Sequence, residues 1–559
     1  MDKIWLNSYP EGIPSEIDPD EYSSLLDLFE ESIAKYGDKV AYENMGATLT
    51  FNELDQKSAA FAAYLQRKGL QKGDRFVVQS PNLIQYPIAI FGILRAGLVV
   101  VNTNPLYTPK EMQHQFTDSG AKGILILANF ASNLQKIIKN TGIEHVIVTE
   151  VADMVGGLKG WAMNMAIKHL KKMVPAYSLP QAVSFKDALY EGKKYNYSKP
   201  KFDSGDIAFL QYTGGTTGVS KGAMLTHRNI IANMQQLVAW VDVSDIKEGE
   251  ETGITALPLY HIFALTFNCF GLLRYGVKNV LITNPRDMAG FVEELKKHKM
   301  GLISGVNTLF NGLLNQPEFK NVDFSDLKVA LGGGMAVQEA VNNRWKEVTG
   351  QPIAEAYGLT ETSPGLIVNP LIGDVRIGWI GLPLPSTEVR ILDDAGNDVE
   401  PGQPGEICGK GPQIMKGYWE RPEETANVMI GDYFKTGDIG VMDEKGYFKI
   451  VDRKKEMILV SGFNVYPNEI EGVIALNDKV LEVGVIGIPD PKSNEAIMAC
   501  VVKKDDSLTK EELRAFCKEH LTGYKVPKHV VFKDELPKSN VGKILRRILK
   551  EQELGKTDA

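Results

Sequence analysis

Residues 212–222 read YTGGTTGVSKG and directly follow the apolar run DIAFLQ. Glycines at several of these positions allow backbone amides to approach an anion closely, hydroxyl side chains supply further donors, and one lysine adds positive charge. The stretch therefore predicts a phosphate-binding loop after a buried strand. The candidate phosphate contacts are Thr213, Gly214, Gly215, Thr216, Thr217, Gly218, Ser220 and Lys221.

This loop does not have the Walker A pattern. GxxxxGK[ST] cannot be aligned, because Lys221 follows Ser220 and precedes Gly222. The sequence thus disfavours P-loop kinases and GTPases. A plain surface turn is the structural alternative, but the density of glycine and hydroxyl residues after a buried strand favours phosphate binding.

The chain around the loop alternates short β-branched runs with amphipathic stretches. DRFVVQS at 74–80 and GLVVVNTNP at 97–105 flank the helical IQYPIAIFGILRAG at 84–97, and similar alternation continues to LKVALGGG at 327–334. Such a pattern is typical of βαβ units and a largely parallel sheet. We therefore predict a large α/β domain.

The sequence pattern changes twice in the rest of the chain. From about Gly381, turn signals such as DAGN and PGQPG separate short strands, which indicates a small β subdomain over about 381–452. After VDRKK the pattern becomes α+β. We predict an N-terminal domain of residues 1–452 and a mobile C-terminal domain of residues 453–559.

Composition restricts the functional class. The 559 residues carry a formal charge of −8, from 62 Lys and Arg against 70 Asp and Glu, without the concentrated cationic face that general nucleic-acid binding needs. Four well-separated cysteines favour a reducing compartment, and the acidic start lacks the basic and apolar parts of a secretory signal. We expect a cytoplasmic protein. The uncharged stretch 252–273 is broken by Pro258, His261 and Asn268, and is expected to be a buried strand and helix rather than a membrane span.

The segment 154–177, MVGGLKGWAMNMAIKHLKKMVPAY, differs from its surroundings because it is basic and amphipathic. On one continuous helix its apolar stripe would lie opposite its lysines. It is either an insertion packed on the domain surface or a helix lying on the cytoplasmic face of an anionic membrane. The stripe is Met163, Ala166, Ile167, Leu170, Met173 and Val174, and the lysines are Lys168, Lys171 and Lys172.

The 212–222 loop resembles the signature of the adenylate-forming superfamily, which includes acyl-CoA synthetases, luciferases and peptide-synthetase adenylation domains. Further motifs resemble that family in the expected order, over nearly the whole chain. The block 432–465 resembles the fatty acyl-CoA synthetase signature, and the chain is similar to the bacterial long-chain fatty acid–CoA ligase family. The motifs are LPLYHIF at 257–263, GGG at 332–334, AEAYGLTETSP at 354–364, YFKTGDIG at 433–440, VDRKKEMILVSGFNVYPNEIE at 451–471 and PKSNVGKILRR at 537–547.

The resemblance implies an adenylate-forming fold and a two-step ligase. A long-chain fatty acid would react with ATP to give an acyl-adenylate and pyrophosphate, and coenzyme A would then take the acyl group and release AMP. ATP, Mg²⁺ and coenzyme A are the implied cofactor and co-substrates. The partners would be the fatty acid, ATP and coenzyme A, without nucleic acid, and a homodimer is compatible with the family.

Matching positions imply roles for individual residues. Glu361 would ligate Mg²⁺ and Thr360 would contact the α-phosphate. Tyr357, followed by Gly358, would stack on adenine, with Gly332, Gly333 and Gly334 leaving room for the base, and Asp438 and Arg453 would contact the ribose. Lys543 would bridge the carboxylate and the α-phosphate, and His261 would orient or gate the acyl site. Rotation about a hinge near Lys455 would exchange Lys543 for the coenzyme A contacts Ser461, Gly462 and Phe463.

Two alternatives remain open from the sequence. The same adenylation could act on an aryl or medium-chain acid, and a reading from another class is a membrane-surface fatty-acid carrier that binds nucleotide without turnover. The apolar runs that the resemblance places along the acyl pocket, such as 262–264 and 303–309, favour a long aliphatic acid.

Overall fold

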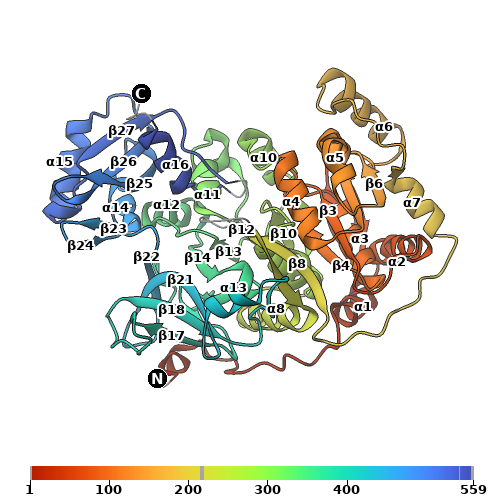
Figure 1. Cartoon of the computed structure of the whole chain (residues 1–559), viewed down its shortest axis with the longest axis horizontal. Helices are drawn as coiled ribbons and strands as arrows, with labels where there is room; N and C mark the ends of the chain where they lie inside the picture. The colour runs from red at the N-terminus through yellow and green to blue at the C-terminus, as the bar shows by residue number, and fades with distance from the viewer. Residues whose placement is uncertain (1–2, 214–219, 540–541, 556–559) are drawn as a thin grey trace.

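The computed structural model describes residues 3–213, 220–539 and 542–555. The predicted phosphate contacts Gly214, Gly215, Thr216, Thr217 and Gly218 therefore lie outside the described residues. Figure 1 shows two large α/β regions formed by the first two thirds of the chain, a β-rich region beside them, and the C-terminal residues as a separate lobe. The predicted α/β fold class is confirmed.

The two large sheets are mostly parallel, and helices follow their strands. Strands such as β5 are buried along their whole length, as expected where both faces of a parallel sheet are covered. One sheet has the order β16 (Leu382–Pro383), β15 (Gly365–Val368), β14 (Ile353–Gly358), β13 (Val329–Gly333), β12 (Leu302–Gly305), β10 (Thr252–Thr255), β11 (Lys278–Leu281), β1 (Val40–Asn44), β2 (Ala47–Thr50). The other has the order β19 (Gly417–Tyr418), β9 (Lys221–Thr226), β8 (Ile207–Thr213), β4 (Val99–Asn102), β3 (Arg75–Gln79), β5 (Gly123–Leu127), β6 (His145–Thr149), β7 (Val183–Ser184).

Two smaller sheets complete the chain. The predicted β subdomain is a sheet of β17 (Glu388–Leu392), β18 (Gly405–Lys410), β21 (Tyr433–Met442) and β20 (Met429–Ile430), with β22 (Phe448–Arg453) paired to β21. It begins later than Gly381, because β16 still belongs to a large sheet. The last sheet is β24 (Phe463–Val465), β23 (Ile458–Val460), β26 (Asn494–Lys503) and β25 (Val480–Asp490), with β27 (His529–Lys533) paired to β26.

Helix ends follow the local sequence, as α4 (Pro109–Ser119) illustrates. Thr108 caps the helix by accepting from the backbone N–H of Glu111, Pro109 occupies the first turn, and Gly120 ends the helix with a left-handed φ of 60°. The other α-helices are α1 (Leu25–Tyr36), α2 (Phe51–Arg67), α3 (Gln85–Arg95), α5 (Ala131–Ile137), α6 (Gly157–Met165), α7 (Phe185–Gly192), α8 (His227–Val241), α9 (Leu272–Arg274), α10 (Met288–Leu295), α11 (Asn307–Leu314), α12 (Glu339–Thr349), α13 (Pro422–Asn427), α14 (Pro467–Ala475), α15 (Lys510–His520) and α16 (Arg546–Leu554).

The uncharged stretch 252–273 is a buried strand and a buried helical segment, as predicted. It contains β10 and then the π-helix η5 (Ala264–Gly271), every residue of which is buried. In the parts of the chain that the structure describes, no helix combines the length and the apolar character needed to cross a bilayer.

The segment 154–177 does not form the single helix that its periodicity predicts. α6 ends at Met165, a π-helical turn follows over Ala166–Leu170, and the chain then loses helical structure. As a result the apolar stripe is divided: Leu170 and Met173 are exposed, whereas Met163 and Ile167 are half-buried. The helix projects from the edge of the molecule near β6 and α7 (Figure 1).

Candidate active site

The ends of the predicted phosphate loop are joined by a β-hairpin. β8 and β9 are antiparallel, and Thr213 pairs with Lys221, so the loop leaves and re-enters the sheet at adjacent positions. Lys221 is thus the first residue of a strand. Its ammonium forms an ion pair with Glu424 and lies 5.1 Å from the centre of the Tyr418 ring. A positive charge is therefore held at the base of the loop.

Glu361 lies beside this charge. It belongs to the short 3₁₀ turn η7 (Thr360–Thr362) that follows β14, and its side chain is buried. The Tyr418 hydroxyl donates to its Oε1 over 2.7 Å. Burial raises the pKa of Glu361, while the Tyr418 hydrogen bond and the charges of Arg453 and Lys221 oppose that rise. Thr360, half-buried, precedes Glu361 in the same turn.

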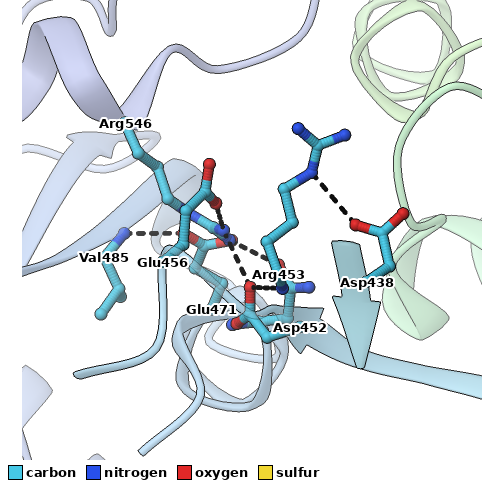
Figure 2. A network of polar contacts seen from close by, with 8 residues as sticks. Asp438, Asp452, Arg453, Glu456, Glu471, Val485 and Arg546 are labelled. Atoms are coloured by element: carbon cyan, nitrogen blue, oxygen red, sulfur yellow. Dashed lines mark hydrogen bonds and ion pairs between the residues drawn. The ribbon is translucent and has the colours of Figure 1, made fainter. Parts of the chain in front are cut away.

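Tyr357, Asp438 and Arg453 form a second group, and the sheet register explains why. Asp438 on β21 lies directly opposite Arg453 on β22, and their side chains approach within 3.3 Å. Tyr357, at the end of β14, donates its hydroxyl to the other carboxylate oxygen of Asp438 over 2.7 Å. Figure 2 shows the Arg453 guanidinium reaching toward Asp438. Three residues predicted to bind one nucleoside are thus brought together from two sheets.

The glycines predicted to lie against the base, at 332–334, have little room for a side chain. A Cβ on Gly333 would lie 2.8 Å from the Phe263 ring and 3.1 Å from the carbonyl oxygen of Ala356, and Gly334 has a left-handed φ of +77°. Any side chain at these positions would be crowded or strained. The glycines therefore keep this surface at backbone level.

Lys543 belongs to the C-terminal lobe and lies near the same group. Its loop is closed at the base, because the Lys543 N–H donates to the Ser539 hydroxyl over 3.1 Å and its carbonyl accepts from the Ser539 N–H over 2.7 Å. Burial lowers the pKa of Lys543 to about 8; the charge of Arg453 adds to this effect, and Asp438 and Glu456 oppose it. The ammonium is thus within electrostatic reach of Asp438 and Arg453.

The Lys543 loop is docked on the large domain. The hydroxyl of Thr308, on α11, donates to the carbonyl of Gly542 over 3.0 Å, and Asn311 on the same helix donates to the carbonyl of Leu481 over 3.1 Å. Gly542 has a left-handed φ of +81°, and a Cβ there would lie 2.5 Å from the Thr308 hydroxyl oxygen. This close approach therefore requires glycine.

His261 follows Tyr260 after β10 and is the first residue of the segment that leads into η5. Burial lowers its pKa to about 4, and the charge of Lys543 lowers it further in the same direction. Its Nδ1 accepts from the N–H of Phe263 at 3.4 Å. The imidazole is therefore neutral at physiological pH and close to the Lys543 charge.

The predicted coenzyme A contacts lie elsewhere in this structure. Ser461, Gly462 and Phe463 are exposed at the turn between β23 and β24. Phe463 is 55% exposed and stacks on Tyr524 of its own lobe, with ring centres 4.7 Å apart. The residues predicted to bind the nucleotide lie together with the Lys543 loop near them, whereas the 461–463 turn is exposed.

The predicted hinge lies between residues with different partners. Lys454 pairs with Asp394 and Glu406 of the β subdomain, at 2.7 and 3.3 Å, whereas Glu456 pairs with Arg546 of the C-terminal lobe. Lys455 is exposed between them. The two neighbours of Lys455 thus bind different parts of the chain.

Sequence reasoning missed four residues that hold the site together. Tyr418 and Glu424 lie in the GYWERPEE run at 417–424, and Asp452 and Arg546 lie inside the motifs that gave Arg453 and Lys543. Each of the four has sequence neighbours of ordinary surface composition, which give no sign of a role in the site. Only the register of β19 on β9 brings Tyr418 beside the loop hairpin.

Comparison with known proteins gives matches along the whole chain. A family model described as AMP-binding enzyme matches residues 29–419, and one described as AMP-binding enzyme C-terminal domain matches residues 469–543. A long-chain-fatty-acid–CoA ligase of Escherichia coli O6:H1 is 56% identical over 559 residues, covering 100% of both chains.

More distant proteins agree with these matches. A long-chain-fatty-acid–CoA ligase of Bacillus subtilis (strain 168) is 39% identical, covering 99% of this chain and 98% of the relative. Among solved structures, ATP-bound MatB from Rhodopseudomonas palustris superposes with a TM-score of 0.81 at 28% identity, covering 95% of this chain and 99% of the other.

Proposed function

This chain belongs to the AMP-binding enzyme family and is a ligase that activates long-chain fatty acids to acyl-CoA, and from that premise we propose how its residues perform the reaction. ATP and coenzyme A are its co-substrates. The chemical obstacle in the first step is repulsion, because a carboxylate must attack the α-phosphorus of a polyanion. Catalysis therefore depends mainly on alignment and on neutralising charge.

The observation that carries the proposal is the position of Lys543. Its ammonium lies near enough to Asp438 and Arg453 for their charges to act on its pKa, and these two residues form one group with Tyr357. The roles of this group are to stack on adenine and to bind the ribose. A cation delivered beside the sugar stabilises the charge that develops between the fatty carboxylate and the α-phosphate. Lys221, at the base of the hairpin loop, neutralises the leaving diphosphate together with the loop residues 213–220.

Glu361 fits the Mg²⁺ that the resemblance implies. Mg²⁺ takes hard oxygen ligands, commonly one or two carboxylates together with substrate phosphates. Glu361 offers a carboxylate oriented by Tyr418 and lying close enough to Lys221 to feel its charge. When bound there, Mg²⁺ would offset phosphate charge that a single lysine does not. Thr360, in the same turn, would donate its hydroxyl to the α-phosphate.

The second step needs a different arrangement of the C-terminal domain. We assign residues 1–452 and 453–559 to the two domains, with the hinge at Lys455, where the chain changes partners. Rotation there would withdraw Lys543 and bring Ser461, Gly462 and Phe463 to the thiol of coenzyme A. His261 is neutral, which suits an orienting role beside the acyl carbonyl.

The acyl chain would lie among the apolar residues that begin with Ile262. Phe263 and Phe267 pack there with ring centres 6.3 Å apart, at the start of the buried η5 segment. Each buried methylene contributes about 0.8 kcal/mol, so a long acid gains binding energy that a short acid cannot.

The reaction is tested by pyrophosphate exchange. Labelled pyrophosphate should enter ATP when palmitate is added, more slowly with octanoate, and not with coumarate. Mg²⁺ should be required, and Glu361→Gln should reduce exchange strongly. Exchange supported by coumarate alone would contradict the assignment of the acid, and thioester formation by the purified protein would dismiss the carrier alternative.

The segment 154–177 supports peripheral attachment to the cytoplasmic face of a membrane. Leu158 is 86% exposed and Trp161 63%, and with Met165 they form one face of α6, three and four residues apart. Asn164, which is buried, anchors the helix by accepting from the Ala152 N–H over 2.8 Å. An exposed aromatic and aliphatic face beside lysines fits an anionic lipid surface. The lysines are Lys168, Lys171 and Lys172.

Vesicle binding tests this attachment. The double variant Leu158→Ser and Trp161→Ser should bind phosphatidylglycerol vesicles at least about tenfold more weakly than the unmodified protein, because interfacial binding scales with buried apolar area. Leu476→Ser, which removes an exposed leucine just after α14, is the matched control and should bind like the unmodified protein. Equal binding by all three proteins would end the proposal.

The proposal also covers the location of the protein and its oligomeric state. The four cysteines are buried and none is in a disulfide, which supports residence in the reducing cytoplasm. The homodimer stays a prediction, which light scattering of the purified protein would test.

A further inference from the structure

A buried ionic cluster centred on Arg546 joins the two sides of the hinge (Figure 2). The guanidinium binds Glu471 of α14 with two hydrogen bonds, from Nε over 3.0 Å and from Nη2 over 2.7 Å. It also contacts Glu456 and Asn468. All three partners follow Lys455, so these contacts lie within the C-terminal domain.

Asp452 is the exception, because it precedes the hinge. It is the penultimate residue of β22 and is fully buried. Its Oδ1 accepts from Arg546 over 3.3 Å and from the Arg453 N–H over 2.7 Å, and its Oδ2 accepts from the Asn468 N–H over 2.8 Å. A carboxylate of the β subdomain thus binds both the N-terminal turn of α14 and the first residue of α16.

The electrostatics of the cluster depend on this contact. Burial raises the pKa of Asp452 to about 6, and Arg546 is the main charge that opposes the rise. Burial alone would lower the pKa of Arg546, but Glu471, Asp452 and Glu456 together hold it above its usual value. Because a buried charge is costly without its partner, separating Asp452 from Arg546 carries a penalty.

Arg546 is also three residues from Lys543. It begins α16, directly after the closed loop that carries Lys543, and the Leu545 N–H fixes that junction by donating to the Pro537 carbonyl over 2.8 Å. The contact to Asp452 therefore ties the base of the lysine loop to the strand that carries Arg453. The loop tip is held separately, by Thr308 on Gly542.

We propose that Asp452 and Arg546 are positioning residues for the first half-reaction, which hold the C-terminal domain in the orientation that places Lys543 at the nucleotide and which separate when the domain turns for thioester formation. Neither touches substrate. The inference rests on the proposed function, in which the C-terminal domain takes one orientation for adenylation and another for thioester formation. It adds a specific contact that favours the adenylation orientation.

The decisive variant is Asp452→Asn, which removes the charge but keeps a similar shape. Adenylation, measured as palmitate-dependent pyrophosphate exchange, should fall about 10- to 100-fold, the size expected for losing a hydrogen bond between charged groups. Thioester formation from supplied palmitoyl-adenylate and coenzyme A should stay within about threefold. Glu469→Gln, which breaks the ion pair with Lys525 inside the C-terminal domain, is the matched control and should leave both steps unchanged.

A second measurement reads the domain contact itself. Arg453, Lys454 and Lys455 make the linker a target for trypsin, and Asp452→Asn should be cut there several-fold faster than the unmodified protein or Glu469→Gln. If Asp452→Asn is digested throughout and therefore does not fold, Arg546→Lys takes its place, since it keeps the charge and loses the Nη1 that donates to Asp452. It should show the same selective loss of adenylation.

Equal loss of both half-reactions, or no loss of adenylation, would overturn the inference. The variant Lys543→Ala distinguishes failure of this inference from failure of the proposed function. If that variant loses only adenylation while Asp452→Asn and Arg546→Lys show no selective effect, the positioning role is wrong and the two-step assignment stands. If Lys543→Ala loses neither step, the two-step assignment itself fails.

Discussion

Lys221 and Lys543 bring positive charge to the same site in different ways. Lys221 lies in a strand of a large sheet, paired with Glu424 and placed over Tyr418, so its surroundings belong to one domain. Lys543 comes from another domain on a loop that rests against α11, and burial lowers its pKa to about 8. The Lys221 charge is thus built into the large domain, and the Lys543 charge is delivered to the site by the C-terminal domain. The contrast matches a reaction whose first step needs both lysines and whose second step needs the space that Lys543 occupies.

The largest expected effect comes from removing the delivered charge. Lys543→Ala should lower pyrophosphate exchange about 10²- to 10³-fold, as for other groups that stabilise charge in a transition state. Transfer from supplied palmitoyl-adenylate to coenzyme A should change little, because we propose that Lys543 is withdrawn in that step. Equal loss in both assays would contradict a delivered charge.

Removing the built-in charge should have a smaller effect. Lys221→Ala should lower exchange about 10- to 100-fold, the size of one hydrogen bond to a charged group. The effect should appear mainly as a higher KM for ATP, since our proposal places Lys221 at the outer phosphates before and during reaction. Glu424→Gln, which leaves the lysine in place, is the control; a similar loss in both variants would show that the ion pair, and not the lysine, matters.

The two lysines should also differ in pH dependence. Because the pKa of Lys543 is lowered to about 8, its ammonium is present below pH 8 and is lost as pH rises through 8. The kcat/KM for adenylation, which reports the free enzyme, should therefore fall above pH 8. In Lys543→Arg the charge persists, so the falling limb should disappear at whatever rate remains. An unchanged limb would assign the titration to another group.

The smallest expected effect concerns the partner shared by Glu361 and Lys221. Tyr418→Phe removes the hydrogen bond to the Glu361 carboxylate and keeps the ring beneath Lys221. Exchange should fall about 3- to 10-fold, in line with one hydrogen bond. Because that bond lowers the pKa of Glu361, the acidic limb of the rate profile should move to higher pH. A loss as large as that of Lys221→Ala would mean that Tyr418 has a more direct role.

Much of this arrangement could be predicted from the sequence, because it depends on local pattern. Alternating apolar runs predicted the parallel strands, and motif positions predicted Tyr357, Asp438 and Arg453, which the structure joins. Asp452 could not be found in the same way. It stands in VDRKK, a run that reads as a solvated linker, and its burial arises only when α14 and α16 pack over β22.

The single helix predicted for segment 154–177 was wrong for a related reason. Its 3.6-residue periodicity predicts one long helix, but Asn164 is anchored to Ala152 and Asp153, and the helix widens into a π-turn one residue after Met165. Tertiary contacts thus decided where the helix ends. They also decided which apolar residues are exposed. Leu158 and Trp161, which are not in the predicted stripe, are exposed, whereas most residues of that stripe are not.

The four cysteines have a practical consequence for watching the domains move. Cys269, Cys408, Cys500 and Cys517 are each at most 1% exposed, so none offers a thiol that a dye could reach in the folded protein. A fluorophore pair attached through two introduced surface cysteines, one on each side of residue 455, would then carry the only reactive labels. Energy transfer between them would report the angle between the lobes through a single turnover, in an otherwise native background.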